Sequence, residues 1–458
     1  MALRETPHTA DSDLFRQELC NIIDLRHPLV QLTQKIDWQS CEAKFGGLYA
    51  AGIGRPGHPI RLMVALQLLK HTSNVSDEEV VATWVENPYW QYFCGEQYFR
   101  HDLPIDPSLM TGFRKRIGQA GCEFILGLTL GAGLATKTVA KSSLAVVNVD
   151  TTVQDKAIAF PTDARLLHKA RLALVRLAKR QGIALRQSYE RIGKAAFVRS
   201  QRYAHARQMN RAKAQTRKLR TYLGRIIRDI QRKLTAEQQA PSRMSQLLQV
   251  AMRIYTQPRK RSEGDPPKLY SVHAPEVECI AKGKAHKQYE FGVKVGIVST
   301  SRESFVVAAQ SLPGNPYDGH TLQACIEQAT RVTGVAPQEA YADRGYKGHG
   351  CNTESLKVWI SGTKRGVTAT IQRKLKRRNA VEPVIGHLKS DGRLARNFLK
   401  GVEGDAMNAL LCGAGHNMRK ILKKLRLFCA VLSISIRRFL NVLSASCSQP
   451  PTTTTATL

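Results

Sequence analysis

The chain has 458 residues, of which 43% are apolar, so it can form two or three domains with buried cores and is not a disordered protein. Its 69 Lys and Arg against 36 Asp and Glu give a formal net charge of +33. This excess favours a polyanionic partner, and nucleic acid fits a chain without an anchor better than a membrane does. The N-terminus lacks a secretory pattern and the ten cysteines form no C-x-x-C pair, so we expect a reduced cytoplasmic protein without a zinc site.

The N-terminal part is expected to be helical. We assign residues 1–35 to an N-terminal arm and residues 36–130 to a helical domain, in which leucines at helical spacing are followed by a capping box of Ser76 and Glu79. A third predicted helix carries Arg114 and Arg116. Short helices with basic ends suit duplex DNA, but they equally suit any small helical bundle.

Residues 140–162 are assigned to the first part of a second domain. The apolar run 142–150 predicts a buried strand that stops at Asp150. Ligands of open α/β sheets bind where strands end, so this aspartate is a candidate site residue.

Residues 163–262 differ sharply from the rest of the chain. Residues 161–260 contain 25 Lys and Arg against four acids. Apolar residues recur at helical spacing, which predicts a basic helical hairpin inserted into the second domain. The charges could be only a solvated face, but such an excess repels itself unless a polyanion screens it, so we expect contact with DNA phosphates.

Residues 263–425 are assigned to the remainder of the second domain. They predict strands at 289–300 and 304–314, then a helix that Gly334 ends, two short strands and a basic helix. Residues 426–458 predict a C-terminal amphipathic helix, broken by arginines and so not a membrane span, and a disordered tail. The order of elements predicts an α/β fold with a mixed sheet.

Three acids stand where predicted elements begin or end beside basic residues: Asp150, Asp343 and Glu382. Phosphodiester chemistry commonly uses two divalent ions, and carboxylates suit Mg²⁺ because it is a hard cation. If neighbouring strands bring the two aspartates together, a helix that crosses that edge could supply the glutamate.

The residues around two of these acids allow simpler interpretations as well. Asp343 precedes a glycine, which is ordinary turn chemistry, and Asn379 with Glu382 fits a capping box. Against this, Arg344 and Lys347 would bring phosphates to Asp343. On a helix, Arg378, Glu382 and Lys389 would share one side. Asp318 is expected only to start a helix after a turn.

The segments "VVNVDTT", "YADRGYKGH" and "RNAVEPVIGHLKSDGR" resemble, in this order, the three acidic motifs of DDE transposases from bacterial insertion sequences, in the group related to the fourth and fifth insertion-sequence families. The third segment is similar to that group's Y-(2)-R-(3)-E-(6)-K signature, with Leu375 at the tyrosine position. The resemblance runs from about residue 36 to about residue 425. It includes "GRPGHPIRLMVALQLLK" in the helical domain and "LPGNPYDGHTL" in the core.

This resemblance implies a ribonuclease-H-like core and a two-metal mechanism with Mg²⁺, for which Mn²⁺ can substitute. Asp150 and Asp343 would bind the two ions and Glu382 would complete one site, while Arg378 and Lys389 would contact DNA. Water would nick the 3′ ends of the element, and the freed hydroxyls would attack target DNA. A homodimer that joins two DNA ends and acts on the bacterial nucleoid is also implied.

Two other functions remain open on the sequence. A decayed or domesticated copy would bind DNA without needing the three acids. A metal-dependent repair nuclease would cut DNA without joining it.

Overall fold

The computed structural model describes residues 17–49, 57–234, 242–258, 262, 264–281, 288–351, 356–363 and 365–447, with the side chains of the last helix described as far as residue 427. The first 16 residues of the expected arm, part of the linker that closes the insertion and the tail after residue 447 lie outside the described residues.

The N-terminal region is helical, as predicted. Its helices are α1 (Leu19–Ile22), α2 (Pro28–Thr33), α3 (Trp38–Phe45), α4 (Ile60–Ser73), α5 (Asp77–Glu86), α6 (Pro88–Cys94) and α7 (Ser108–Ala135). The predicted capping box is present, because Ser76 accepts from the Glu79 backbone and Glu79 accepts from that of Ser76. The assignment of 1–35 as a separate arm needs correction from residue 19 onward: Leu29 and Leu32 of α2 are buried in the same core as α4 and α7.

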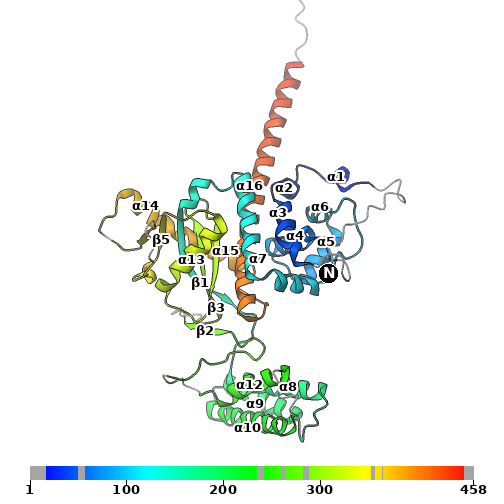
Figure 1. Ribbon diagram of the computed structural model, residues 1–458, viewed down its shortest axis with the longest axis vertical. Coiled ribbons are helices and arrows are strands. Elements are labelled where there is room, and N and C mark those ends of the chain that lie inside the picture. The colour runs from blue at the N-terminus through cyan, green and yellow to red at the C-terminus, as the bar shows by residue number, and fades with distance from the viewer. Residues whose placement is uncertain are drawn as a thin grey trace, which may run out of the picture.

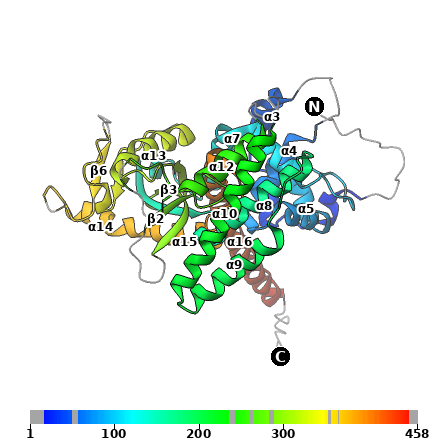
Figure 2. The ribbon, with the colours of Figure 1, turned by 90° about the horizontal axis from the view of Figure 1, so that it is seen from below.

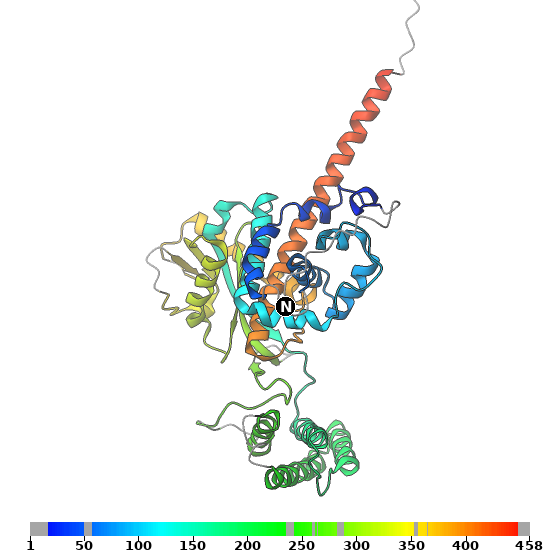
Figure 3. The ribbon, with the colours of Figure 1, turned by 45° about the vertical axis from the view of Figure 1, so that its right-hand side comes forward.

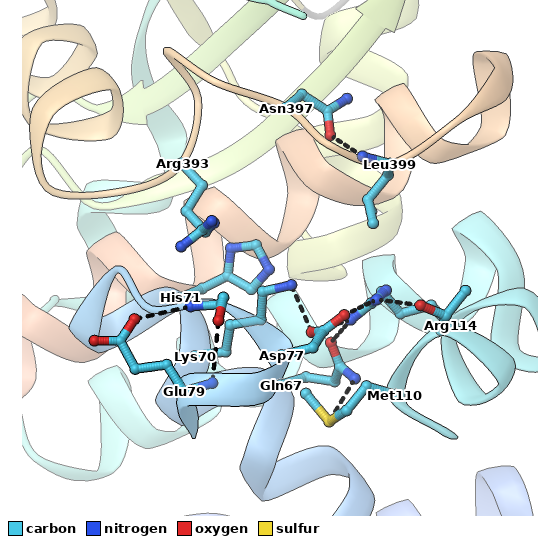
Figure 4. A network of polar contacts seen from close by, with 12 residues as sticks. Gln67, Lys70, His71, Asp77, Glu79, Met110, Arg114, Arg393, Asn397 and Leu399 are labelled. Atoms are coloured by element: carbon cyan, nitrogen blue, oxygen red, sulfur yellow. Dashed lines mark hydrogen bonds and ion pairs between the residues drawn. The ribbon is translucent and has the colours of Figure 1, made fainter. Parts of the chain in front are cut away.

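A buried ion network holds α4, α5 and α7 together (Figure 4). The guanidinium of Arg114 donates to Asp77 Oδ2 at 2.6 Å and to Gln67, and Lys70 Nζ lies 2.7 Å from Asp77 Oδ1. The side chain of Arg114 is only 1% exposed. The prediction that Arg114 binds DNA is therefore wrong: as the only long cation of its helix that points inward, it serves as the counter-ion of Asp77.

The sheet is built around β1 (Val146–Asp155). This strand pairs antiparallel with β3 (Tyr289–Thr300) on one side and parallel with β5 (Glu339–Ala342) on the other. Outside β5 lies β6 (Lys357–Ile360), and the far edge of β3 pairs with both β4 (Val306–Leu312) and β2 (Glu278–Ala281). The mixed sheet was predicted, but β2 was not.

The expected end of the first strand was also wrong. Asp150 lies in the middle of β1, which continues to Asp155 because β3 is long enough to pair with it throughout. The shorter strand is β5, which ends at Ala342. Asp150 therefore lies where the parallel pair ends, although its own strand continues.

Helices cover both faces of the sheet. On one face, α13 (Asp318–Thr333) packs so closely that a Cβ added to Gly296 would lie 2.3 Å from Cys325 Sγ. The other face, with Val295 and Ile297, packs against α15 (Val381–Ser390) and α16 (Gly401–Cys447). As predicted, α13 ends at Gly334, which has a left-handed conformation.

The long helix α16 joins the sheet to the N-terminal helices. It contacts α4, α7 and β4, and it then leaves the body as a single rod (Figures 1 and 3). The C-terminal helix expected after residue 426 is thus the continuation of a helix that begins at Gly401. Its first part is predominantly apolar and buried, so the N-terminal helices and the sheet share one core.

The helix α7 is long and apolar enough to cross a membrane by length and composition alone, but half of its apolar window is buried. Ile125 and Leu126 of this helix are fully covered within the shared core. Because a core helix passes the same test, α7 is weak evidence for a membrane span.

The basic insertion forms a helical bundle with its own core. It contains α8 (Asp163–Arg180), α9 (Glu190–His205), α10 (Met209–Lys233) and α12 (Arg243–Thr256). Leu174, Leu223 and Ile230 are among its fully buried residues. The expected hairpin was therefore too simple: the described residues form four helices. They lie apart from the body, below the sheet in Figure 1, and in front of the body in the view from below (Figure 2).

A second buried ion network fixes β1 where the chain leaves for the insertion. Lys156 Nζ lies 2.8 Å from Glu276 Oε1 and 2.7 Å from Asp405 Oδ1. Asp405 belongs to α16, and Gln154 donates to its backbone carbonyl. The two chain segments that lead to and from the bundle are thus held to the helix behind the sheet.

We expect Asp77→Ala to lower the free energy of unfolding by about 3 to 5 kcal/mol, because the buried cations Arg114 and Lys70 lose their shared counter-ion. Burial acts to raise the pKa of Asp77, but the two cations outweigh it and lower the pKa to about 2. This stabilisation is therefore complete above the ordinary carboxyl pKa and is lost as the pH falls toward 2.

Urea unfolding followed by tryptophan fluorescence measures the effect. The control is Asp102→Ala on an exposed loop, which should change the free energy by less than about 0.5 kcal/mol. Equal unfolding of the Asp77 variant and the parent would contradict the role of the network.

Candidate active site

The parallel pairing of β1 with β5 places two of the predicted acids side by side. Asn148 is in register with Tyr341, so Asp150 and Asp343 lie two residues further on at the same level. Alternate residues of a strand share a face, and both aspartates therefore lie on the face that α15 covers. The β6 strand extends the sheet beyond β5.

The environment of Asp150 disfavours its charge. Burial raises the pKa of Asp150 most, the neighbouring Asp343 raises it further, and Glu382 adds to this. The backbone N–H of Thr151 and the guanidinium of Arg378 act in the opposite direction. The resulting pKa is about 6. Two carboxylates that repel each other in this way favour a nearby cation.

Asp343 does cap a turn. Its Oδ1 accepts from the backbone N–H of Gly345 at 2.9 Å, at the start of the short 3₁₀ turn Arg344–Tyr346. The simpler interpretation from the sequence is therefore confirmed for this oxygen. A carboxylate fixed by one oxygen can still present the other, so the cap orients Asp343 without excluding a metal-binding role.

Glu382 is separated from Asp150 by the side chain of Arg378. It is the second residue of α15, and its side chain is 66% exposed. The buried Arg378 lies in the 3₁₀ turn before α15, with its guanidinium 3.5 Å from Asp150 Oδ2 and 3.8 Å from Glu382 Oε1. The guanidinium of Arg378 thus lies between Asp150 of β1 and Glu382 of α15 and separates their carboxylates.

The capping box proposed for Glu382 is wrong. The residue before α15 is Ala380, which has no side-chain cap, and Asn379 instead accepts from Arg378 at 3.0 Å. The turn between α14 (Ala369–Arg377) and α15 displaces Asn379 from the capping position. Further along α15, Lys389 Nζ lies 3.7 Å from Glu290 of β3.

Three of the predicted DNA-binding residues are exposed cations. Arg344 and Lys347 follow Asp343 directly, and both are exposed. Arg116 is exposed on α7, with its guanidinium 4.6 Å from the ring centre of Tyr49. These three side chains can meet phosphates, whereas the buried Arg114 cannot.

The donor chemistry suits a hard divalent cation, although the described residues contain no group of three or more His, Cys, Asp or Glu close enough to hold one. Asp150 and Asp343 supply two adjacent carboxylates. A site formed by all three acids therefore requires the exposed Glu382 to move toward the two aspartates.

Sequence reasoning missed a fourth acid at this end of the sheet. Asp318 starts α13 as expected, but its Oδ1 also accepts from Thr151 Oγ1 and Lys294 Nζ, each at 3.0 Å. One signal was present: Lys294 stands between valines in a buried strand, and a buried lysine needs a counter-ion. Which acid forms the ion pair with Lys294 depends on the register of the sheet.

Comparison with known proteins adds independent findings. Residues 17–116 match a family described as a transposase domain, and residues 271–418 match one described as a transposase DDE domain. An uncharacterised protein of Rhizobium meliloti, ORF8 in the nfe locus, is 55% identical over 202 residues, which are 44% of this chain and 97% of that protein. No solved structure matches the chain. The second matched range contains Asp343 and Glu382.

We expect Asp150→Asn to stabilise the folded protein by roughly 2 to 3 kcal/mol at pH 8 without divalent cations, because the amide removes an unfavourable buried charge. A folded-state pKa raised to about 6 means that stability is lost as the pH rises through 6. The gain should therefore disappear as the pH falls toward the ordinary carboxyl pKa.

Thermal unfolding over a pH series measures this difference. Glu339→Gln is the control of opposite sign: burial raises the pKa of Glu339, but hydrogen bonds from Lys374 and Tyr341 outweigh it and lower the pKa overall. Identical melting of the Asp150 variant and the parent at every pH would show that the charge of Asp150 has no net cost in the folded protein.

Proposed function

Because this chain belongs to the DDE transposases of insertion sequences, we propose that it binds the inverted-repeat ends of its own element, cuts them by two-metal hydrolysis and joins the 3′ hydroxyl ends to target DNA. Asp150, Asp343 and Glu382 are the catalytic acids of this proposal. The two matched transposase domains support the general role of a DNA transposase.

One observation carries the proposal. The register of β1 with β5 puts Asp150 and Asp343 at the same level of the sheet, and the helix that covers this face carries Glu382. These are the acids that the sequence motifs single out in the same order. The exposed Arg344 and Lys347 lie at the same end of the sheet.

The strand order supports a ribonuclease-H-like core. The strand with the first acid is central, antiparallel to β3 and parallel to the strand with the second acid. The hairpin partner β4 lies outside β3, and the third acid comes from a later helix. This arrangement brings acids that are far apart in sequence to one edge, as a site for phosphodiester chemistry requires.

Each acid has a definite part in the proposed chemistry. Asp150 and Asp343 hold two Mg²⁺ ions, or Mn²⁺ in their place, and Glu382 completes one site. The ions supply activation of the attacking oxygen and stabilisation of the leaving oxygen. The turn that caps Asp343 keeps its carboxylate fixed while DNA binds.

The neighbouring cations place the DNA backbone. Arg344 and Lys347 contact the phosphates next to the cleaved bond. Lys389 exchanges Glu290 for a phosphate. Arg378, whose side chain is 11% exposed against 1% for Arg114, contacts DNA from between Asp150 and Glu382. Charge-assisted bonds of this kind are roughly twice as strong as neutral ones.

The insertion offers a further surface for DNA binding, along the helix α10. Along α10, Lys218, Arg225, Arg228 and Arg232 are exposed on one side, at intervals of seven, three and four residues. The helix is about 37 Å long at 1.5 Å per residue, close to one turn of duplex DNA. Phosphates that follow this row would screen the mutual repulsion of its charges. Arg116 of the N-terminal helices is a second contact.

A homodimer is part of the proposal, because two DNA ends must be held together for joining. The protein acts on the nucleoid in the bacterial cytoplasm. Its transposition activity combines that of an endonuclease with that of a strand transferase.

We expect Asp343→Asn to lower the rate of end cleavage and of joining by about 100-fold or more, because it weakens the site that would hold the Mg²⁺ ions, which would stabilise charge at the reacting phosphate. Binding of the same DNA should remain, since the exposed cations are unchanged. The measurement uses purified protein, Mg²⁺ and a duplex that carries the ends of the element, with gel shift as the binding control.

The same experiment separates the two rival functions. Binding without cleavage by the parent protein would indicate an inactive DNA-binding derivative. Cleavage without joining would indicate a nuclease.

We expect Lys218→Gln and Arg228→Gln each to reduce the slope of log affinity against log salt by about 0.9, because each removes one phosphate contact. Arg331→Gln is the matched control, since this exposed arginine pairs with Glu123 outside the insertion. Filter binding over a salt series gives the slopes. Unchanged slopes for both α10 variants would show that these residues of the insertion do not contact DNA phosphates.

A further inference from the structure

The first residue of α13 links three segments of the active site. Asp318 Oδ1 accepts from Thr151 Oγ1 on β1 and from Lys294 Nζ on β3, each at 3.0 Å. Lys294 Nζ also donates to the carbonyl of Pro316 at 2.7 Å, which fixes the loop before α13. Because Thr151 follows Asp150 directly, this network holds the backbone of β1 at the proposed catalytic residue.

The other oxygen of Asp318 faces the turn that carries Asp343. A Cβ added to Gly345 would lie 3.2 Å from Asp318 Oδ2 and 3.0 Å from Asp343 Oδ1. Both carboxylates therefore approach the same glycine, whose N–H donates to Asp343. A side chain at this position would have to displace one or both carboxylates.

Asp318 reaches the site from the opposite face of the sheet. Side chains alternate along a strand, so Thr151 points toward α13 whereas Asp150 points toward α15. Asp318 consequently supports the two aspartates from behind and does not share a ligand position with them. Its effect on the reaction has to pass through Thr151 and Gly345.

A purely structural ion pair is the competing explanation, and the chain contains a close comparison. Glu339 pairs with Lys374 at 2.6 Å, and its side chain is 28% exposed against 29% for Asp318. Glu339 also lies on β5, but at the end of the strand away from Asp343. The two acids share their chemistry and exposure, but Lys294 is 11% exposed against 33% for Lys374, and the acids differ in what they touch.

We propose that Asp318 is a positioning residue of the active site, which with Lys294 fixes Thr151 and the Gly345 turn so that Asp150 and Asp343 stay aligned. The inference rests on the proposed function. Groups that orient metal-binding side chains through hydrogen bonds typically contribute about 10- to 100-fold in metal affinity or activity. The reaction thus depends on Asp318 as well, although this acid is not part of the three-acid motif.

The test compares Asp318→Asn, Thr151→Val and the control Glu339→Gln in the full chain. Mn²⁺ is titrated into DNA-free protein, and free Mn²⁺ is followed by electron paramagnetic resonance. End cleavage with Mg²⁺ gives kcat and KM. We expect Asp318→Asn to weaken Mn²⁺ binding and to lower kcat, each by about 10- to 100-fold, with KM for DNA little changed. Thr151→Val should act in the same direction, and Glu339→Gln should match the parent.

The outcomes separate this inference from the function on which it rests. If the parent cuts DNA and Asp343→Asn does not, the function stands. Parent-like Mn²⁺ affinity and kcat in both Asp318→Asn and Thr151→Val would then overturn the positioning role alone. If Asp318→Asn does not fold, Thr151→Val decides, because it removes one hydrogen bond and leaves no buried charge unpaired. A parent that neither cuts nor joins overturns both.

Discussion

The structure depends on the pairing of one strand, β1, with two neighbours that run in different directions. Its antiparallel partner β3 carries the rest of the sheet on one side, and its parallel partner β5 brings Asp343 to the level of Asp150. Parallel pairing requires a crossover, which here runs through β3, β4 and α13. The same crossover places Asp318 behind the two aspartates. Even the basic insertion is joined to the end of β1.

The charges of the chain are divided between two tasks. Two acids serve inside: Asp77 and Asp405 each hold buried cations and so fix one element against another. Most of the excess cations lie on the insertion, whose helices pack by apolar contacts and leave their charges exposed. A polyanion is the natural partner of such a surface. Asp150 and Asp343 lie at one end of the sheet, where the repulsion between their carboxylates favours a cation.

Local patterns in the sequence predicted the elements well. The capping box before α5, the end of α13 at Gly334 and the hairpin strands β3 and β4 all depend on contacts between residues close in sequence. Predictions failed where distant partners decide the outcome. Arg114 has the same local pattern as the exposed Arg116, and only the position of Asp77 on another helix makes it a buried ion-pair partner.

The sequence by itself determined that this protein is a basic, mixed α/β chain with three acids in the order of a transposase motif. Composition and short-range spacing contain that information, because charge, helix periodicity and turn chemistry are local properties. Only the tertiary structure decided that Asp150 lies within a strand, that Arg378 separates it from Glu382, and that Asp318 lies beneath both aspartates. These relations follow from strand register and helix packing, which bring together residues from different segments of the chain, and the local sequence around one residue does not identify its partner.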